Sequence, residues 1–568
     1  MSSSTASSAA ATHTDGERDN DSSDVQLQLR RKISQAVDEG HDADIPSSEG
    51  FVLSEQDELR RQRSIASRSI ASRSRVDQDV EKAQVPNMAL SNSNTGDGDN
   101  DDMDPNVVWW DGPNDPENPY NWPTWRKALN CGLVSAMTFI SPLASSIFAP
   151  GVPQVTAEFG STSLEIAAFV VSVYVLGFAA GPLLFAPMSE IYGRVALYHF
   201  CNIGFVAFTI GCALAPSMNS LIVFRFFAGA FGSAPITNGG GTIADMISQE
   251  NRGGAMAIFT IGPLLGPIVG PVAGGFLTAA AGWRWSFWLL TIAIGCIAIA
   301  MLFSLKESYA PVILQRKVVR LRKETGNDLL RSKLDAGLSP GDFFKKGIIR
   351  PFKMLFRSPV VALTSLYMAI TYGYLYLMFT TITSVFQEYY GFSTSIVGLA
   401  FLGLGVGSVF GITLFSGTSD KYIQRKAAED KSGMKPEYRL PLLPLGAVLL
   451  PAGLFIYGWT ASYRVHWIVP IIGTAVVGMG NIIVFMAIQL YLVDTFTIYA
   501  ASALACNTVV RSLAGAVLPL AGLPMYDKLG IGWGNSLLAF IAILLLPVSI
   551  LILKFGERLR ARFPIKNL

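Results

Sequence analysis

The chain has 568 residues, of which 50% are hydrophobic and only 15% are charged, and its mean hydropathy is +0.38. The formal net charge of +2 says little by itself, and no nucleic-acid partner is expected. The five cysteines lie in apolar runs without CxxC or His/Cys spacing, which argues against a disulfide framework and against a metal site.

The first 126 residues are hydrophilic, and we expect them to form a disordered cytoplasmic N-terminal tail. No apolar core follows the first residues, so no cleavable signal peptide is expected. Arginine precedes serine by three residues at Arg31/Ser34 and at Arg61/Ser64. This spacing suits a kinase that recognises basic residues, so one expected partner is a kinase acting on the tail; a merely solvated charged tail is the alternative.

A segment rich in proline and tryptophan, 118–127, closes the tail. Its prolines end any upstream helix, and Trp122 and Trp125 suit the headgroup layer of a membrane. Arg126 and Lys127 stand at the edge of the first apolar run.

Twelve apolar runs of about 20 residues follow, the length that a bilayer about 30 Å thick requires. They cover roughly 127–149, 165–187, 195–216, 220–244, 254–278, 284–304, 360–386, 394–417, 440–460, 467–489, 500–523 and 532–554. The sequence therefore predicts an all-α membrane protein with twelve transmembrane helices. Its expected parts are an N-terminal six-helix bundle (127–304), a cytoplasmic central loop (305–359), a C-terminal six-helix bundle (360–554) and a cytoplasmic C-terminal tail (555–568).

Lysine and arginine are distributed unequally between alternate loops. The loops on the same side of the membrane as the central loop carry most of these residues. The loops on the other side contain only Arg284, Arg464 and Lys528. The positive-inside rule therefore predicts that both termini and the central loop are cytoplasmic.

The fifth predicted span contains the run GPLLGPIVGPVAGG. Glycine and proline each recur there every fourth residue, at Gly262, Gly266, Gly270 and Gly274 and at Pro263, Pro267 and Pro271. A four-residue step places each set on one slanted stripe of a helix. The prolines predict a bent helix that only a membrane would tolerate, and the glycines predict backbone contact with another helix. A kinked packing helix without a mechanistic role is the alternative.

Charged and polar residues inside the predicted spans are candidates for function, because burying them in a membrane is costly. Arg225 lies inside the fourth span and Arg511 near the middle of the eleventh, and no carboxylate lies near mid-depth in any span. Tyr372 and Tyr376 share one helical face with Phe379, which faces either a pocket or the lipid. The residues expected to line a substrate cavity are Tyr372, Tyr376, Asn507, Arg511, Gln489 and Asn238.

Several motifs resemble one family. The stretch from Gly181 to Arg194, with Glu190 in the acidic position, resembles the G-x-x-x-D-x-x-G-R signature of the major facilitator superfamily in its fungal drug-transporter form. Ala186 and Val195 depart from that signature. A second copy is echoed at Gly417–Lys421, which contains Asp420. The resemblance extends to the arginine in span four, the glycine–proline run in span five, the Asn-Trp-Pro entry and the run around Asn507 and Arg511, and it covers residues 118–560.

The resemblance implies two pseudo-symmetric six-helix bundles that alternate access to a central cavity, and it implies an antiporter-type role for the glycine–proline stripe. Proton coupling or gating is expected of Arg225, Glu190, Arg194, Asp245 and Asp420. Glu190 and Arg194 are four residues apart, within reach on one helical turn, and could act as a latch, with Asp245 and Arg252 in the next connection on the same side. The alternative is that these charges only fix the loop geometry.

The expected function is proton-coupled export of amphipathic organic molecules such as drugs, toxins or secondary metabolites from a fungal cell. No nucleotide-binding loop and no catalytic set of residues is found, so neither direct use of ATP nor an enzyme activity is expected. No cofactor is expected either, and the proton gradient is the expected energy source. The alternatives are an organic-anion or carboxylate transporter, a polyamine transporter and an uncoupled facilitator. We expect a monomer in the plasma membrane, with a vacuolar or other internal membrane as the alternative.

Overall fold

The computed structural model describes residues 106–248, 252–335, 337, 339–429, 435–496 and 499–563. The chain divides into two units, Met1–Asn87 and Met88–Leu568, and every described residue belongs to the second. Residues 1–105 of the predicted disordered tail, with the serines proposed for phosphorylation, lie outside the described residues.

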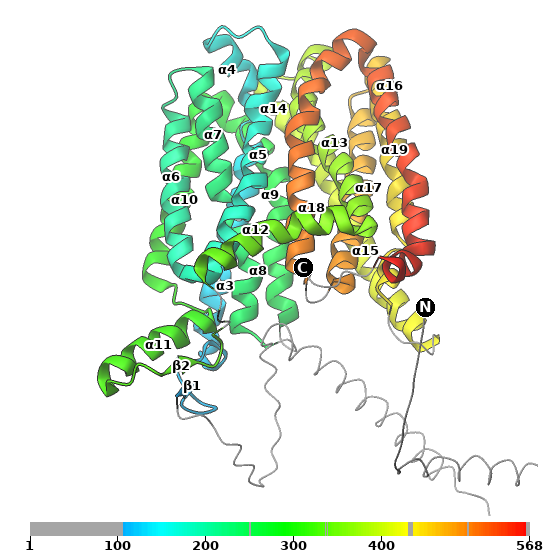
Figure 1. Cartoon of the computed structure of the whole chain (residues 1–568). Helices are drawn as coiled ribbons and strands as arrows, with labels where there is room; N and C mark the ends of the chain where they lie inside the picture. Colours follow the sequence, from blue (N-terminus) through cyan, green and yellow to red (C-terminus); the bar gives the residue numbers. More distant parts are fainter. Residues whose placement is uncertain are drawn as a thin grey trace, which may run out of the picture. The chain divides into compact units, whose positions relative to one another are not determined.

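The first half of the helical bundle is built from long helices that stand side by side (Figure 1). They are α3 (Thr124–Ser146), α5 (Leu164–Tyr192), α6 (Arg194–Ala213), α7 (Met218–Gly232), α8 (Ala234–Met246), α9 (Arg252–Ala281) and α10 (Arg284–Ser304), with η1 (Pro119–Asn121), η2 (Ala149–Gly151) and α4 (Val152–Glu158) as short additions. The fourth predicted span is the pair α7 and α8, which is broken at Ser233, where Pro235 follows in the first turn of α8.

The second half repeats this pattern after the central loop. Its elements are α13 (Pro359–Tyr390), α14 (Thr394–Val397), η3 (Gly398–Phe401), α15 (Leu402–Glu429), η4 (Pro436–Arg439), α16 (Leu443–Ser462), α17 (Ile468–Thr495), α18 (Ala500–Val517), η6 (Leu518–Ala521) and α19 (Gly522–Arg562). The central loop itself holds α11 (Ala310–Thr325), β2 (Arg331–Ser332) and α12 (Pro340–Arg357).

The described residues contain ten helical stretches that are long and apolar enough to cross a bilayer, and the bent α9 adds an eleventh. One of the ten, Ala500–Arg562, has 63 residues, which would extend about 95 Å as a straight helix, three times the apolar thickness of a bilayer. It breaks at Gly530 (φ 76°, ψ 163°), and in Figure 1 the chain rises as α18 and returns as the part of α19 that follows this break. This stretch therefore crosses twice, and the predicted twelve-helix fold is confirmed.

Helix α9 has the two properties that its sequence predicts. Its parts Gly254–Pro263 and Leu265–Ala281 are bent by 41°, as expected where Pro267 removes a backbone donor and its ring crowds the carbonyl four residues earlier. Its glycines face α3: a Cβ atom at Gly266 would lie 2.8 Å from the carbonyl oxygen of Phe139, and one at Gly270 would lie 3.0 Å from the amide nitrogen of Ile147. The stripe therefore allows direct contact between two helix backbones.

The two halves meet along several helix pairs. Ser172 of α5 donates a hydrogen bond to the carbonyl of Ala516 in α18 (2.8 Å), and the hydroxyls of Ser145 in α3 and Tyr376 in α13 lie 3.0 Å apart. At the end of the bundle away from the central loop, Gly275 of α9 packs against the backbone of Thr394.

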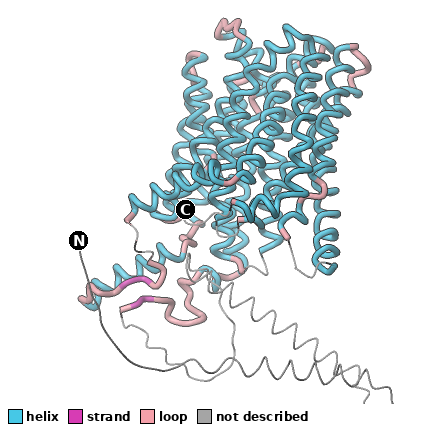
Figure 2. Tube along the Cα trace, turned by 45° about the vertical axis from the view of Figure 1, so that its right-hand side comes forward, coloured by secondary structure: helices cyan, strands magenta, loops and turns pink. Residues whose placement is uncertain are grey.

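The segment before the first span is folded, in contrast to the predicted tail of 126 residues. Strand β1 (Val107–Val108) pairs in parallel with β2, and the two short strands lie beneath the bundle in Figure 2. Lys317 of α11 is only 4% exposed and contacts Asp111 (2.6 Å), Asp115 (3.6 Å) and the carbonyl of Trp109 (3.1 Å). We call residues 106–123, α11 and β2 the entry module. The sequence did not reveal it because its halves are about 200 residues apart and each is hydrophilic alone.

Trp122 also differs from its predicted place in the headgroup layer. Its side chain is only 7% exposed and belongs to the apolar core of the first half, whereas Trp125 is 64% exposed.

Candidate functional site

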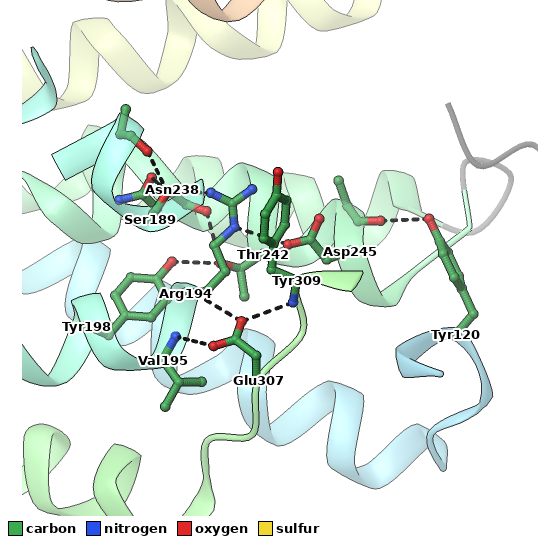
Figure 3. Close-up of polar contacts among 12 residues, drawn as sticks. Tyr120, Ser189, Arg194, Val195, Tyr198, Asn238, Thr242, Asp245, Glu307 and Tyr309 are labelled. Atoms are coloured by element: carbon green, nitrogen blue, oxygen red, sulfur yellow. Dashed lines mark hydrogen bonds and ion pairs between the residues drawn. The ribbon is translucent and has the colours of Figure 1, made fainter. Parts of the chain in front are cut away.

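Arg194 begins helix α6 and is the centre of a polar network at the central-loop end of the bundle (Figure 3). Its Nε lies 3.1 Å from Oδ2 of Asp245 at the end of α8, and its Nη1 donates to the hydroxyl of Ser189 in α5 (2.6 Å). The two charged side chains are only 9% and 19% exposed. Breaking a pair buried to this degree costs about 3–5 kcal/mol, so the network ties three helices together firmly.

Glu307, just after α10, completes this network from the central loop. Its carboxylate accepts hydrogen bonds from the backbone N–H groups of Arg194 (3.0 Å) and Val195 (3.2 Å), which are the first two residues of α6. A carboxylate here satisfies amides that have no partner inside the helix and complements the positive end of the helix dipole. The approach requires Gly193, because a Cβ atom at that position would collide with the carboxylate and its φ of 97° disfavours other residues.

Tyr309 lies beside Glu307 in sequence and covers the guanidinium. The Arg194 Cζ is 4.6 Å from the centre of the Tyr309 ring, a cation–π contact. Burial, together with the nearby Glu190 carboxylate, raises the pKa of the Tyr309 phenol above its ordinary value, so the ring stays neutral at physiological pH. We call Ser189, Arg194, Asp245, Glu307 and Tyr309 the Arg194 network.

The predicted geometry of the latch is wrong in one respect. Glu190 and Arg194 do not share a helical turn, because α5 ends at Tyr192 and α6 begins at Arg194 after the sharp turn at Gly193. The Glu190 side chain is exposed, and the close partner of Arg194 is Asp245. Asn238, expected in the substrate cavity, instead accepts a hydrogen bond from Ser189 (2.9 Å) beside this network.

The second half contains a corresponding pair that the sequence motif did not identify. Arg439, just before α16, lies 2.9 Å from Asp494 at the end of α17, as Arg194 pairs with Asp245 in the first half. Arg560 near the end of α19 binds Glu437 through two contacts of 3.0 and 2.8 Å. Internal repetition explains why the same positions carry ion pairs. The side chains of Asp420 and Arg252 lie outside the described residues.

The entry module contacts the first half beside the Arg194 network. The hydroxyl of Tyr120 donates to the carbonyl of Ala244 (3.1 Å), the residue before Asp245. A displacement of this segment would therefore move the backbone that holds the partner of Arg194.

Arg225 of α7 is 1% exposed and lies inside the first half. Its Nη2 donates to the carbonyls of Ser145 in α3 (3.1 Å) and Val171 in α5 (3.3 Å). The guanidinium lies 5.0, 5.4 and 5.7 Å from the ring centres of Phe148, Tyr174 and Phe287. The partners of this arginine are therefore backbone carbonyls, and aromatic rings surround its guanidinium.

Ser145 connects Arg225 to the second half, because its carbonyl binds the arginine while its hydroxyl contacts Tyr376. The Tyr376 ring packs against Tyr372, with the ring centres 5.1 Å apart, and Arg511 of α18 lies 4.8 Å from the Tyr372 ring centre. We call Arg225, Ser145, Tyr376, Tyr372 and Arg511 the interface cluster. It joins the two predicted membrane arginines through residues of both halves, and no described carboxylate contacts it.

The two remaining residues predicted to line the cavity, Asn507 and Gln489, lie in α18 and α17. Asn507 lies one turn before Arg511 on α18, is fully buried, and neither atom of its amide has a hydrogen-bond partner among the described residues. Gln489 is half-buried in α17. An unsatisfied buried amide is costly, which makes Asn507 a candidate for binding a polar group of a ligand.

The Major Facilitator Superfamily model matches residues 134–519. The chain belongs to the major facilitator superfamily. Its curated relatives include the MFS-type transporter tndD of Aspergillus flavipes, 59% identical over 81% of this chain and 86% of the relative. They also include the MFS-type transporter penM of Penicillium rubens (58% identical, 80% and 90% covered) and the efflux pump radE of Floropilus chiversii (52% identical, 82% and 87% covered).

Solved structures of the superfamily confirm the fold at low sequence identity. The crystal structure of a D-xylose–proton symporter matches with a TM-score of 0.58 at 15% identity, covering 75% of this chain and 97% of that one. The protein is therefore a membrane transporter of the major facilitator superfamily, and these relationships point to a transporter and not to an enzyme. No group of three or more metal-binding side chains is found among the described residues.

Proposed function

We propose that this major facilitator is a proton-coupled exporter of amphipathic organic molecules, such as toxins or secondary metabolites. The observation that carries the proposal is the interface cluster, where Tyr372, Tyr376 and Phe379 of α13 pack ring against ring at the boundary between the halves. Flat aromatic surfaces with few fixed polar groups suit ligands that are largely apolar. The relative named as an efflux pump supports the direction of transport.

The absence of a described carboxylate at the interface cluster weighs against a polyamine, since a polycation would be bound by negative charges. An organic anion is the second candidate. The observation that favours it is Arg511, which is half-buried next to the unsatisfied amide of Asn507, whereas Arg225 is enclosed by backbone carbonyls and rings.

For coupling, we propose that a proton competes with Arg194 for the carboxylate of Asp245. Protonation would remove the charge that holds the guanidinium and would weaken the connection between α6 and α8. Release of the network at the central-loop end would then accompany the opening of that end, which we expect to face the cytoplasm. Such a step lets the proton gradient drive a conformational cycle without a nucleotide.

Transport into inside-out vesicles with an imposed pH gradient tests the function. The full-length protein is offered an aromatic drug, a polyamine and a dicarboxylate, with and without an uncoupler. We expect accumulation of the aromatic compound alone, and its loss when the gradient is dissipated. Accumulation of the dicarboxylate would favour transport of organic anions. Uptake that is unchanged by the uncoupler would contradict proton coupling.

A further inference from the structure

Helix α12 is an amphipathic helix whose outer surface has no function in the networks described above. It lies crosswise in front of the upright α5 and α18 in Figure 1. Its inner side is packed: Met354 is fully buried, and Gly347 lies against the ring of Pro187 in α5. Only Ser358 separates α12 from α13, so its C-terminal end lies where the seventh span begins.

The outer surface of α12 has two parallel stripes. Ile349, Phe352 and Phe356 are 36%, 40% and 84% exposed, and at 100° per residue they fall within about 60° of the helix circumference. A second group of exposed residues, Lys346, Lys353 and Arg357, falls within about 40° and is centred about 90° further round, while the exposed Lys345 lies within the first stripe and the exposed Asp342 between the two. The three cations have no ion-pair partner among the described residues.

An apolar stripe beside a basic stripe is the pattern of a helix that lies in the plane of a membrane interface. In such a helix the aromatic and aliphatic side chains enter the boundary of the acyl chains, and the cations reach the lipid phosphates. The direct connection to α13 places this helix at the correct depth, because the adjoining residues enter the bilayer. Each basic residue near an anionic surface strengthens binding by about a factor of five.

We propose that the outer surface of α12 binds the headgroups of anionic phospholipids in the membrane that the protein spans. The inference depends only on the protein being an integral membrane protein and not on its substrate or coupling. Because Gly347 touches Pro187, two residues before Ser189, lipid binding by α12 acts on a helix that contributes to the Arg194 network.

The test is photo-crosslinking of the full-length protein in phosphatidylcholine liposomes that contain phosphatidylserine. The photoactivatable group is carried by phosphatidylserine in one sample and by phosphatidylcholine in the other, and the labelled peptides are identified by mass spectrometry. We expect residues 340–357 to be labelled preferentially by the phosphatidylserine probe, and the preference to fall at high salt.

The double variant K346Q/K353Q should lower this preferential labelling by up to about thirtyfold at low salt. The variant R316Q/K323Q removes two exposed cations from α11 of the same loop and should leave the labelling of α12 unchanged. F356S should also reduce labelling, whereas L329S, which changes another exposed apolar residue of the central loop, between α11 and β2, should not. Transport activity is not part of the readout, so failure of the proposed function would leave this test unaffected.

Three outcomes would overturn the proposal. Equal labelling by both probes would show ordinary contact with the surrounding lipid. Absence of labelling on α12 would show that this surface does not face the headgroups. Labelling that appears only after removal of residues 1–105 would show that the tail, and not lipid, covers the helix.

Discussion

Arg225 and Arg194 are both buried arginines, yet their environments differ in a way that separates their roles. Arg194 faces a carboxylate, whose charge a proton can remove. Arg225 faces two main-chain carbonyls and three rings, none of which changes charge in the physiological range. At the residue scale, Arg194 is therefore suited to a switch and Arg225 to holding helices α3, α5 and α7 in register.

We predict that Arg225→Lys impairs transport by at least tenfold while the protein still reaches the membrane. A compact ammonium group lacks the planar fork with which the guanidinium reaches two carbonyls while it stacks among three rings, and buried cation–π contacts are worth about 2 kcal/mol. Transport rates normalised to protein in the membrane measure the effect, with Arg316→Lys, a change at an exposed residue of α11, as the control. Undiminished transport by Arg225→Lys would contradict the requirement for the guanidinium.

Glu307 gives the second prediction at this scale. Glu307→Gln keeps an acceptor oxygen but removes the negative charge at the start of α6, a change of about 0.3–1 kcal/mol. We expect turnover to change several-fold with substrate affinity nearly constant, because the residue acts on the network and not on the ligand. Equilibrium binding and transport are compared with those of Glu324→Gln, an exposed carboxylate on α11. A change confined to affinity would assign Glu307 another role.

At the scale of single helices, α9 and α3 depend on each other through the glycine stripe. Gly266→Leu would place a branched side chain against the backbone of Phe139 and Leu143, and overpacking of this kind costs about 1–3 kcal/mol when the contact can relax. We predict loss of transport with retained membrane insertion. Gly295→Leu is the control, since nothing lies within 4 Å of a Cβ atom at Gly295. Normal transport by Gly266→Leu would mean that α9 need not touch α3 during the cycle.

The entry module supplies a prediction about pH. Burial alone would raise the pKa of Asp115, but hydrogen bonds from the amides of Asp111 and Glu117 and the charge of Lys317 outweigh it, so the pKa is lowered from 3.8. Because the pKa is lower in the folded module than in the unfolded chain, the ionised carboxylate stabilises the folded module at pH values above the unfolded pKa. This stabilisation is lost as the pH falls through the folded pKa. We therefore expect the module to loosen below about pH 4.

Hydrogen exchange of residues 106–123 measures this loosening. Asp115→Asn should weaken protection at pH 7 and remove most of its acid dependence. Asp111→Asn should have a smaller effect, because its carboxylate is 80% exposed and exposed ion pairs contribute only about 0–1 kcal/mol. Equal acid dependence in the wild type and Asp115→Asn would exclude this carboxyl as the group responsible.

At the scale of the whole molecule, the sequence was most informative where the membrane imposes a single solution. Long apolar runs must be helices, so the twelve spans follow from length and hydropathy, and the prolines of α9 predict its bend. The entry module, the Glu307 cap and the Arg439–Asp494 pair could not be predicted, because each depends on residues brought together by tertiary packing. Glu307, for example, is 113 residues from Arg194 in sequence. A helical-wheel analysis of 340–357 could have revealed the amphipathic α12.

The arrangement of the whole molecule suggests how the parts cooperate in transport. The halves contact each other at the interface cluster and at the end away from the central loop, while the Arg194 network and its counterpart around Arg439 lie at the central-loop end. Protonation of Asp245 would weaken the first half's network and permit the halves to rock about the interface cluster. On this account substrate and protons must cross the membrane in opposite directions in the same cycle.

The most direct measurement of that claim records proton flux driven by substrate alone. Full-length protein is reconstituted in liposomes that contain a pH-sensitive dye and have no initial pH gradient, and an outward gradient of the aromatic substrate is imposed. We predict that the lumen acidifies as substrate leaves, and that the acidification disappears in Arg194→Ala. Substrate efflux by the wild-type protein without any change in lumenal pH would contradict it.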